Sequence, residues 1–254
     1  MSPAPQGHRN TAGAPYFLVD VVPTAGPFVL AGAEGRHAAT VRRLRVGEQV
    51  VLTDGRGTSA TATVAGVGRG ELTLEVDPAW QEDPPTVRVT LVQAVPKGER
   101  GELAVELATE AGVDALVPWA ASRCVARWTA DRAATGVAKW RATAAAAAKQ
   151  SRRSRVPPVA ELASTPRVAE LIAGADAAIV LHESAHAPLQ GVGLPVAGDV
   201  VVIVGPEGGL TEEELTVFAA AGAVPVRLGP QVLRTSTAGA VVLGALGVLS
   251  GRWS

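Results

Sequence analysis

The chain has 254 residues, of which 47% are hydrophobic and 19% are charged, and its formal net charge is −1. These values exclude a disordered or fibrous protein and argue against a generic basic nucleic-acid binder, and the length allows two domains. The single cysteine, Cys124, cannot form an internal disulfide, and we expect an ordinary, partly buried thiol in a reducing compartment.

Residues 1–15 are rich in proline, glycine and alanine and contain no apolar run of the kind that a signal peptide needs. We therefore expect a flexible tail there. The most apolar stretch, Ala238–Leu249, is too short and too rich in glycine to span a bilayer. A cytoplasmic location and no membrane partner are the resulting expectations.

Short apolar runs follow one another between residues 16 and 77 and are separated by turns that contain glycine. Alternation at this spacing is typical of a small barrel and predicts a β domain over residues 16–80. Prolines cluster between residues 77 and 85, which makes this segment the best candidate for a domain boundary. The clearest predicted strands are Gln49–Leu52, Ala60–Val64 and Glu71–Val76.

From residue 86 onwards the pattern changes to alternating strands and helices, which predicts an α/β domain of doubly wound type over residues 86–254. Thr211–Glu214 has the pattern of a capping box, so a helix is expected to begin there. The helix predicted at Glu99–Ala111 places Leu103, Leu107 and Ala111 on one face. The other predicted elements are strands at Val87–Val95, Ala115–Pro118, Ala177–Leu181, Val200–Val204 and Val224–Leu228, and helices at Asp131–Gln150 and Ser236–Leu249.

Basic residues gather in one segment although the net charge of the chain is close to zero. Between Arg123 and Arg155 the sequence has nine basic residues and one acid, Asp131. Most are arginines, which suit bidentate contacts with phosphate. We favour a surface that faces RNA, and a solvated helix face is the alternative. Trp128 lies in this segment and is the tryptophan that we would test for stacking on a base.

The predicted strand Val200–Val204 runs directly into a glycine-rich loop, Gly205–Leu210, and then into the capped helix. In open α/β sheets ligands bind beyond the carboxyl ends of strands, and glycines let the backbone approach them closely. A plain turn or a phosphate loop is the alternative, but the glutamates at positions 207 and 212–214 favour a neutral or cationic ligand. Two further strand-end loops, at residues 181–184 and 228–238, are expected to converge on the same place.

A metal site is not expected. His182 and His186 stand four residues apart, which alone is a weak signal. The proline at position 188 and the glycines after it argue against a helix that would bring the two rings together, and no third ligand is evident.

Three motifs together resemble the signature of the SPOUT class of trefoil-knotted methyltransferases: Gly205–Thr211, Leu228-Gly229 and Leu233–Ala238. The resemblance is strongest to the RsmE-type 16S ribosomal RNA uridine-N3 methyltransferases, and it covers nearly the whole chain. Further similar segments are Pro96–Arg100, Ala108–Val113 and Gln150–Pro157, and, for the family's PUA-like domain, His37 with Arg43, Val46–Glu48 and Asp54-Gly55. The chain departs from the family at Arg42, where leucine is frequent, and at Ser236, where glutamate is frequent.

The resemblance implies a C-terminal SPOUT domain with a deep trefoil knot, an N-terminal PUA-like β-barrel, a homodimer, and 16S ribosomal RNA or the small ribosomal subunit as partner. It also implies S-adenosyl-L-methionine as the cofactor. Carried over position by position, the cofactor-binding residues would be Leu181, His182, Glu183, Gly205, Glu207, Gly208, Gly209, Leu228, Gly229, Leu233, Thr237 and Ala238. The RNA-binding residues expected from the resemblance and from the basic segment are His37, Arg42, Arg43, Lys97, Arg123, Arg152, Arg153 and Arg155.

The implied reaction is the methylation of N3 of a uridine, and it needs a base that is unpaired or turned out of its stack. N3 must lose its proton, so a group that stabilises the resulting anion is required. Arg234 is the first choice for that role, and the alternative is a helix-proximal arginine paired with a carboxylate. Glu207 is either the base or a ligand of the cofactor's polar groups, and we favour the ligand. The alternatives for the whole chain are a ribose 2′-O methyltransferase of the same class and a non-catalytic RNA-binding or assembly factor.

Overall fold

The computed structural model describes residues 13–253, with the backbone alone at residue 130; residues 1–12, which make up most of the predicted tail, and residue 254 lie outside this part. The chain forms two compact units. The first comprises the residues up to Asp83 together with Lys149–Arg155, and the second comprises Pro84–Ala148 and Val156–Ser254. The boundary at residue 83 lies in the proline-rich segment. Residues 149–155, which the sequence places in the C-terminal domain, group with the first unit.

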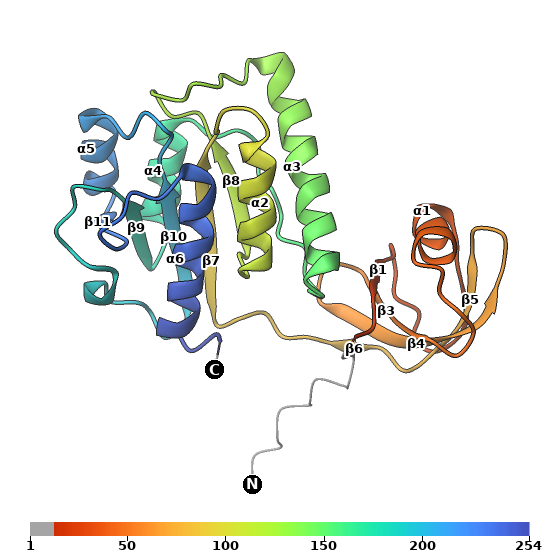
Figure 1. Ribbon diagram of the computed structural model, residues 1–254. Coiled ribbons are helices and arrows are strands. Elements are labelled where there is room, and N and C mark those ends of the chain that lie inside the picture. Colours follow the sequence, from red (N-terminus) through yellow and green to blue (C-terminus); the bar gives the residue numbers. More distant parts are fainter. Residues whose placement is uncertain (1–12, 254) are drawn as a thin grey trace, which may run out of the picture. The chain divides into compact units, whose positions relative to one another are not determined.

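The first unit is built on one mixed sheet in the order β1-β3-β4-β5-β2, with β6 paired to β4 (Figure 1). β1 runs parallel to β3, and the other pairs are antiparallel. Alternation explains its core: in β5, Leu72, Leu74 and Val76 are buried while the residues between them are exposed. The elements are β1 (Tyr16–Leu18), β2 (Gly26–Leu30), α1 (Gly32–Arg36), a π-helical turn (His37–Val41), β3 (Gln49–Thr53), β4 (Thr58–Val67), β5 (Leu72–Val76) and β6 (Trp80–Gln81).

Residues 149–155 belong to the first unit because they bond to it directly. The Ser154 carbonyl accepts hydrogen bonds from the Gly57 amide at 3.1 Å and from Thr53 Oγ1 at 3.0 Å. Lys149 Nζ lies 2.6 Å from the Glu34 carboxylate. These contacts hold a segment that is distant in sequence against the sheet.

The second unit contains a five-stranded, wholly parallel sheet in the order β11-β9-β10-β7-β8. The predicted strands are confirmed with small differences at their ends. The elements are β7 (Val87–Ala94), α2 (Arg100–Glu110), β8 (Ala115–Trp119), α3 (Ala130–Gln150), α4 (Thr165–Ala173), β9 (Ala177–Leu181), a 3-10 turn (Leu189–Gly191), β10 (Gly198–Val204), α5 (Glu212–Ala220), β11 (Val224–Val226) and α6 (Thr235–Leu249).

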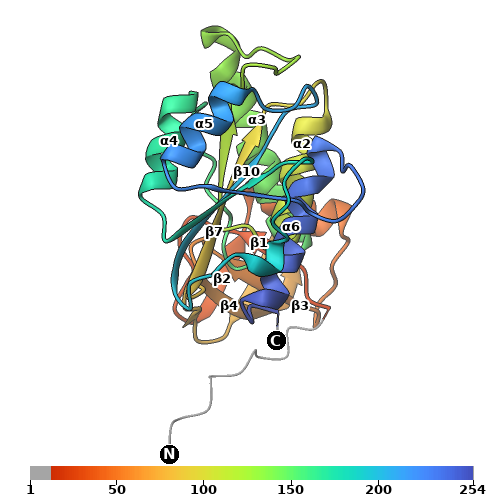
Figure 2. The same cartoon turned by 90° about the vertical axis from the view of Figure 1, so that its left-hand side faces the viewer.

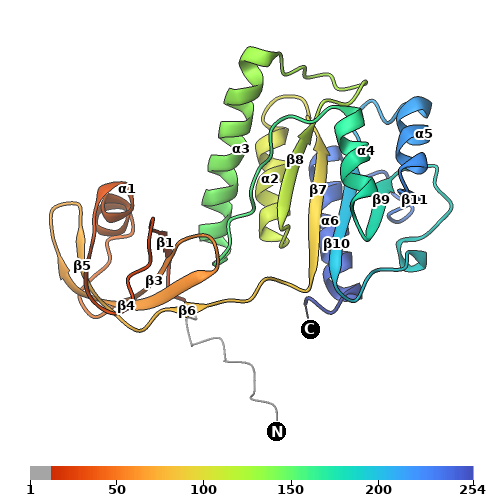
Figure 3. The same ribbon diagram turned by 180° about the vertical axis from the view of Figure 1, so that it is seen from behind.

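Helices cover both faces of this sheet, as expected of buried parallel strands. Figures 2 and 3 show α4 and α5 on one face and α2 and α6 on the other. In β10, Val200, Val202 and Val204 pack toward the α2–α6 side, whereas Val201 and Ile203 pack toward the α4–α5 side. The sheet is therefore the middle layer of three, and its carboxyl edge is the place where a ligand site is expected.

Two features differ from the sequence analysis. The helix α4 was not predicted. In α2 the buried face consists of small residues around Ala104, Val105 and Ala108, and Leu103 is 42% exposed. None of the described helices is long and apolar enough to cross a membrane.

Candidate active site

A cavity of about 610 Å³ opens at the carboxyl edge of the parallel sheet. The loops that follow all five strands contribute to its lining. Arg100 comes after β7, Arg123 after β8, and the segments 182–184, 205–212 and 227–235 come after β9, β10 and β11. The three loops that the sequence analysis expected to converge therefore do so.

The glycine loop after β10 needs its glycines for two reasons. Gly209 has φ +72, a left-handed conformation that side chains disfavour. A Cβ atom at Gly208 would lie 3.0 Å from the Arg123 carbonyl oxygen, so the backbone of the neighbouring loop fits against it only because the side chain is absent. The loop can thus be narrow and still leave an open cavity beside it.

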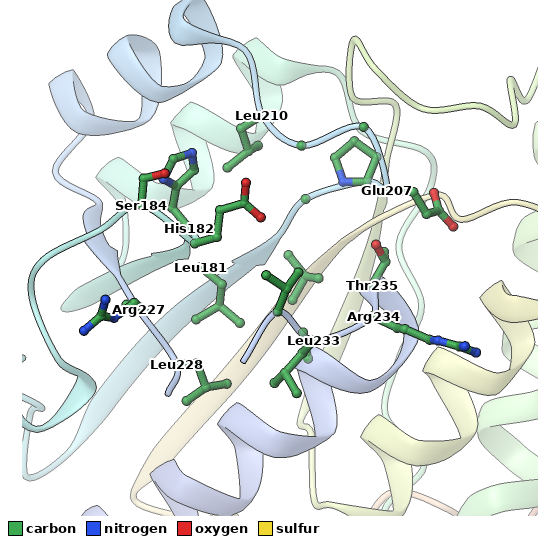
Figure 4. A pocket seen from close by; sticks show the side chains of 18 of the residues that line it. Leu181, His182, Ser184, Glu207, Leu210, Arg227, Leu228, Leu233, Arg234 and Thr235 are labelled. Carbon is green, nitrogen blue, oxygen red and sulfur yellow. The ribbon is translucent and has the colours of Figure 1, made fainter. Parts of the chain in front are cut away.

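Charged side chains of both signs line the cavity, and polar or charged groups lie at each of its two ends. Figure 4 shows Glu207 and Arg234 at one end, with His182, Ser184 and Arg227 at the other. Leu181, Leu228 and Leu233 lie between them (Figure 4). A ligand that has an apolar face and carries polar groups on either side of it fits such a lining.

Arg234 lines this cavity and is exposed. Its backbone carbonyl accepts hydrogen bonds from the amides of Thr237 and Ala238 at 2.9 and 3.0 Å, so it begins α6 through its backbone. No described side chain accepts a hydrogen bond from its guanidinium or forms an ion pair with it, so the alternative of an arginine paired with a carboxylate has no support. Glu207, in contrast, accepts a hydrogen bond at Oε1 from the Lys97 amide at 3.2 Å. The glycine loop and the loop after β7 are therefore connected through Glu207.

Glu214 is a residue whose importance the sequence analysis missed. The capping box is confirmed, because the Thr211 amide donates to Glu214 Oε2 at 2.9 Å and the Glu214 amide donates to Thr211 Oγ1 at 3.1 Å. Glu214 Oε1 accepts a second hydrogen bond, from the Ser122 amide at 2.8 Å, and the residue is only 2% exposed. One buried carboxylate thus joins the loop after β8 to the start of α5.

Arg123 reinforces the same connection. Its Nη1 donates to the Leu210 carbonyl at 3.1 Å and lies 3.4 Å from the Gly208 carbonyl oxygen. Because of these bonds, Arg123 braces the glycine loop and lines the cavity at the same time. No signal in the sequence indicates either contact, since the partners are more than 80 residues apart.

Of the residues expected to bind the cofactor, all but Thr237 line the cavity. The Thr237 hydroxyl donates to the Arg234 carbonyl at 3.1 Å, which is a contact within the first turn of α6. Residues that line the cavity and were not among the expected ones are Arg100, Ser184, Val204, Pro206, Leu210, Glu212, Arg227, Pro230, Gln231, Val232 and Thr235.

The residues expected to bind RNA are divided between the two units. Lys97 and Arg123 lie in the second unit, and His37, Arg42, Arg43, Arg152, Arg153 and Arg155 lie in the first. Arg42, Arg43 and Arg152 are exposed. His37 packs against the Phe17 ring at 6.1 Å between centroids, and Arg155 donates to the carbonyls of Arg56 and Glu82.

The basic segment is therefore not one uniform charged face. Lys149 and Arg155 make the contacts within the first unit described above, and Arg141 donates to the Val159 carbonyl and to the Glu161 carboxylate in the second. Several of the basic side chains that were expected to face RNA therefore form contacts within the protein instead. Among the described residues, no group of three His, Cys, Asp or Glu side chains is arranged to hold a metal ion.

Comparison with known proteins places this chain among the RNA methyltransferases. Residues 82–247 match the model of an RNA methyltransferase domain, and residues 30–77 match that of an RNA methyltransferase PUA domain. The chain is 52% identical over 245 residues to ribosomal RNA small subunit methyltransferase E of Mycobacterium tuberculosis, with 94% of each protein covered.

Solved structures give the same result. The structure of ribosomal RNA small subunit methyltransferase E from Neisseria gonorrhoeae bound to S-adenosyl methionine is 28% identical with a TM-score of 0.81, and the match covers 93% of this chain and 98% of that one. A putative methyltransferase from Legionella pneumophila in complex with SAM is 26% identical with a TM-score of 0.80, and the match covers 93% and 97%. The chain belongs to the ribosomal RNA small subunit methyltransferase E family.

Proposed function

We propose that this protein transfers a methyl group from S-adenosyl-L-methionine to N3 of a uridine in 16S ribosomal RNA. The observation that carries the proposal is the cavity at the carboxyl edge of the sheet, where the loops after β9, β10 and β11 converge. The relatives reported above are named as methyltransferases of small-subunit ribosomal RNA, and two similar structures contain the cofactor. A cytoplasmic location follows from that substrate.

The lining fits the cofactor chemically. S-adenosyl-L-methionine has a planar adenine, a cationic sulfonium, an amine and a carboxylate. Leu181, Leu228 and Leu233 supply apolar contacts, and carboxylates such as Glu207 favour positive charge nearby. The cofactor supplies an activated methyl group, and the protein positions the reactants and manages charge. We assign cofactor binding to the expected residues that line the cavity.

Arg234 is assigned to the RNA base. Its guanidinium has no partner in the described part of the chain, and it stands at the same end of the cavity as Glu207 (Figure 4). Loss of the N3 proton places negative charge on the flanking carbonyl oxygens of uracil, and a positioned guanidinium stabilises such charge. Glu207 is assigned to binding the cofactor and not to proton transfer, because it already accepts a hydrogen bond from the Lys97 amide.

The finer structural proposals are a trefoil knot in the second unit, a closed PUA-like barrel in the first, and a homodimer. The family match supports the first two. Exposed apolar side chains on neighbouring helices support the third: Leu103 on α2 is 42% exposed, and Val241 and Val248 on α6 are 46% and 70% exposed. A second copy would cover such a surface.

A calorimetric titration with S-adenosyl-L-methionine and mass spectrometry of ribosomal RNA nucleosides test the proposed function. We expect binding of one cofactor per chain and the loss of N3-methyluridine from the small-subunit RNA of a deletion strain, with its restoration by the intact gene. Absence of cofactor binding would leave an RNA-binding or assembly factor. Loss of a ribose 2′-O-methyl mark, with N3-methyluridine intact, would assign the other methylation chemistry.

Charge reversal at exposed arginines of the first unit tests the RNA-binding assignment. We expect the double variant Arg42→Glu and Arg152→Glu to weaken binding of a small-subunit RNA transcript by about tenfold or more, and the slope of log K against log salt to fall by about one for each lost phosphate contact. Arg69→Glu is the matched control, because Arg69 is exposed in the same unit but outside the expected set. An unchanged salt slope in the double variant would make these arginines a solvated surface.

A further inference from the structure

A second cavity, of about 290 Å³, lies behind the loop that follows β8. The loop separates it from the first cavity. Arg123 lines the first cavity, whereas Ser122 and Cys124 on either side of it line the second. Val95, at the end of β7, lines the second cavity as well. The loop at residues 122–124 is therefore a wall that contributes residues to both cavities.

Hydrogen bonds join this wall to the glycine loop and to α5, and a further one lies within the loop itself. The Ser122 amide donates to Glu214 at 2.8 Å, Arg123 donates to the Leu210 carbonyl at 3.1 Å, and the Cys124 amide donates to the Ala121 carbonyl at 3.1 Å. The fold therefore holds this wall in one position. A ligand chain that reaches both cavities meets a wall that is already in place.

The lining of the second cavity suits an uncharged planar group next to an anion. Val95, Leu162 and alanines supply apolar walls, and Trp128 supplies an aromatic one. No carboxylate of the described residues lines it, in contrast to the first cavity. Arg127 also lines it, is exposed, and makes no hydrogen bond or ion pair with any described residue. Nucleobases stack on aromatic rings, and arginine pairs with phosphate.

Trp128 is held in place before any ligand arrives. Its ring packs edge to face on the buried ring of Trp140, with centroids 5.4 Å apart and an interplanar angle of 72°. It also lies against Gly136 in α3, where an added Cβ would be 2.6 Å from the Trp128 ring. A pre-positioned aromatic wall loses little conformational entropy on binding, which favours its use as a stacking surface.

We propose that the second cavity receives an unpaired nucleobase of the RNA substrate, adjacent to the nucleotide that is methylated, with Arg127 at the connecting phosphate. This inference rests on the proposed function, since it takes the first cavity as the site of methyl transfer. It explains how a single-stranded target is held in register: the neighbouring base is anchored on one side of the wall while the target base faces the cofactor on the other.

The single cysteine of the chain is a native probe of this cavity. Cys124 lines it and is 8% exposed, and burial raises the pKa of its thiol, so alkylation is slow at neutral pH and increases only at higher pH than for an exposed thiol. We expect saturating short oligouridylate to slow alkylation of Cys124 by iodoacetamide by about tenfold, measured by intact-protein mass spectrometry. An abasic oligoribonucleotide of equal length, which keeps the phosphates, should leave the rate unchanged. Equal protection by both oligomers, or protection by neither when anisotropy shows the oligouridylate bound, would overturn the proposal.

Arg127→Ala gives an independent arm that does not disturb the core. It should weaken oligouridylate binding by about fivefold to tenfold and leave the affinity for S-adenosyl-L-methionine unchanged. Arg132→Ala is the matched control, because Arg132 is exposed in the same basic segment but does not line the cavity. Equal RNA affinities for the two variants would also count against the proposal. Calorimetry with the cofactor distinguishes failure of this proposal from failure of the proposed function. If the protein binds the cofactor and methylates RNA but Cys124 stays unprotected, only the nucleobase site is ruled out.

Discussion

Arg234→Ala is expected to lower kcat for RNA methylation by about a hundredfold while the melting temperature stays within about 2 °C of the parent. The large effect follows from the place of the guanidinium, which lines the cavity and has no partner in the described part of the chain. The small effect on stability follows because Arg234 begins α6 through its backbone carbonyl and gives no side-chain cap. Single-turnover methylation of a small-subunit RNA transcript is the measurement.

Two companion variants make this result specific. Arg234→Lys keeps the charge but loses the planar fork, so it should recover only part of the rate if the guanidinium contacts the two sides of a uracil carbonyl. Arg167→Ala removes an exposed arginine of α4 that pairs with Glu170 and does not line the cavity, and it should leave kcat unchanged. Full activity of Arg234→Ala would remove its assigned role, and a raised KM for RNA with an unchanged kcat would reduce that role to binding.

The sequence predicted the sheet of the second unit well because its longest strands, β7 and β10, are rich in β-branched residues and are closely followed by proline or glycine. It predicted the converging loops for the same reason, since parallel strands bring their carboxyl ends to one edge. The helix α4 was missed. It has only nine residues, although its buried side chains, Val168 and Ile172, have the i, i+4 spacing of a helix and Pro166 stands in its first turn, so the sequence does carry a helical signal there.

The hydrophobic period of a helix did not predict which of its faces packs against its neighbours. In α2 the leucine at position 103 suggested the buried face, yet the helix packs through small residues. Gly101 shows the reason, because a Cβ atom there would lie 2.9 Å from Trp140 Nε1. Because the helix lies so close to its neighbours, only its face of small residues can pack against them. Leu103 therefore lies on the surface, where a second copy of the chain is proposed to cover it.

The sequence also could not show which basic side chains form ion pairs within the fold. A run of arginines and lysines predicts a basic surface, but it does not reveal which of them find partners within the fold. Lys149 lies 2.6 Å from Glu34 and Arg141 lies 2.8 Å from Glu161, and neither acid is near its partner in sequence. Arg127 and Arg152 could be distinguished from these only by a structure, and they are the ones on which the RNA predictions rest.

Glu214→Gln is expected to raise the dissociation constant for S-adenosyl-L-methionine by about tenfold, because hydrogen bonds to a charged group contribute about 1.5–3 kcal/mol. Glutamine can still accept from the Thr211 amide and so keeps the capping box, which tolerates glutamine at this position. Its amide nitrogen cannot accept from the Ser122 amide, so the loop after β8 loses its attachment to α5. Arg123 then braces the glycine loop less firmly, and the cavity becomes less well ordered. Glu213→Gln removes the same charge from the same turn at an exposed position and should leave cofactor affinity unchanged. A lower melting temperature with unchanged cofactor affinity in Glu214→Gln would contradict this account, since it would limit Glu214 to capping the helix.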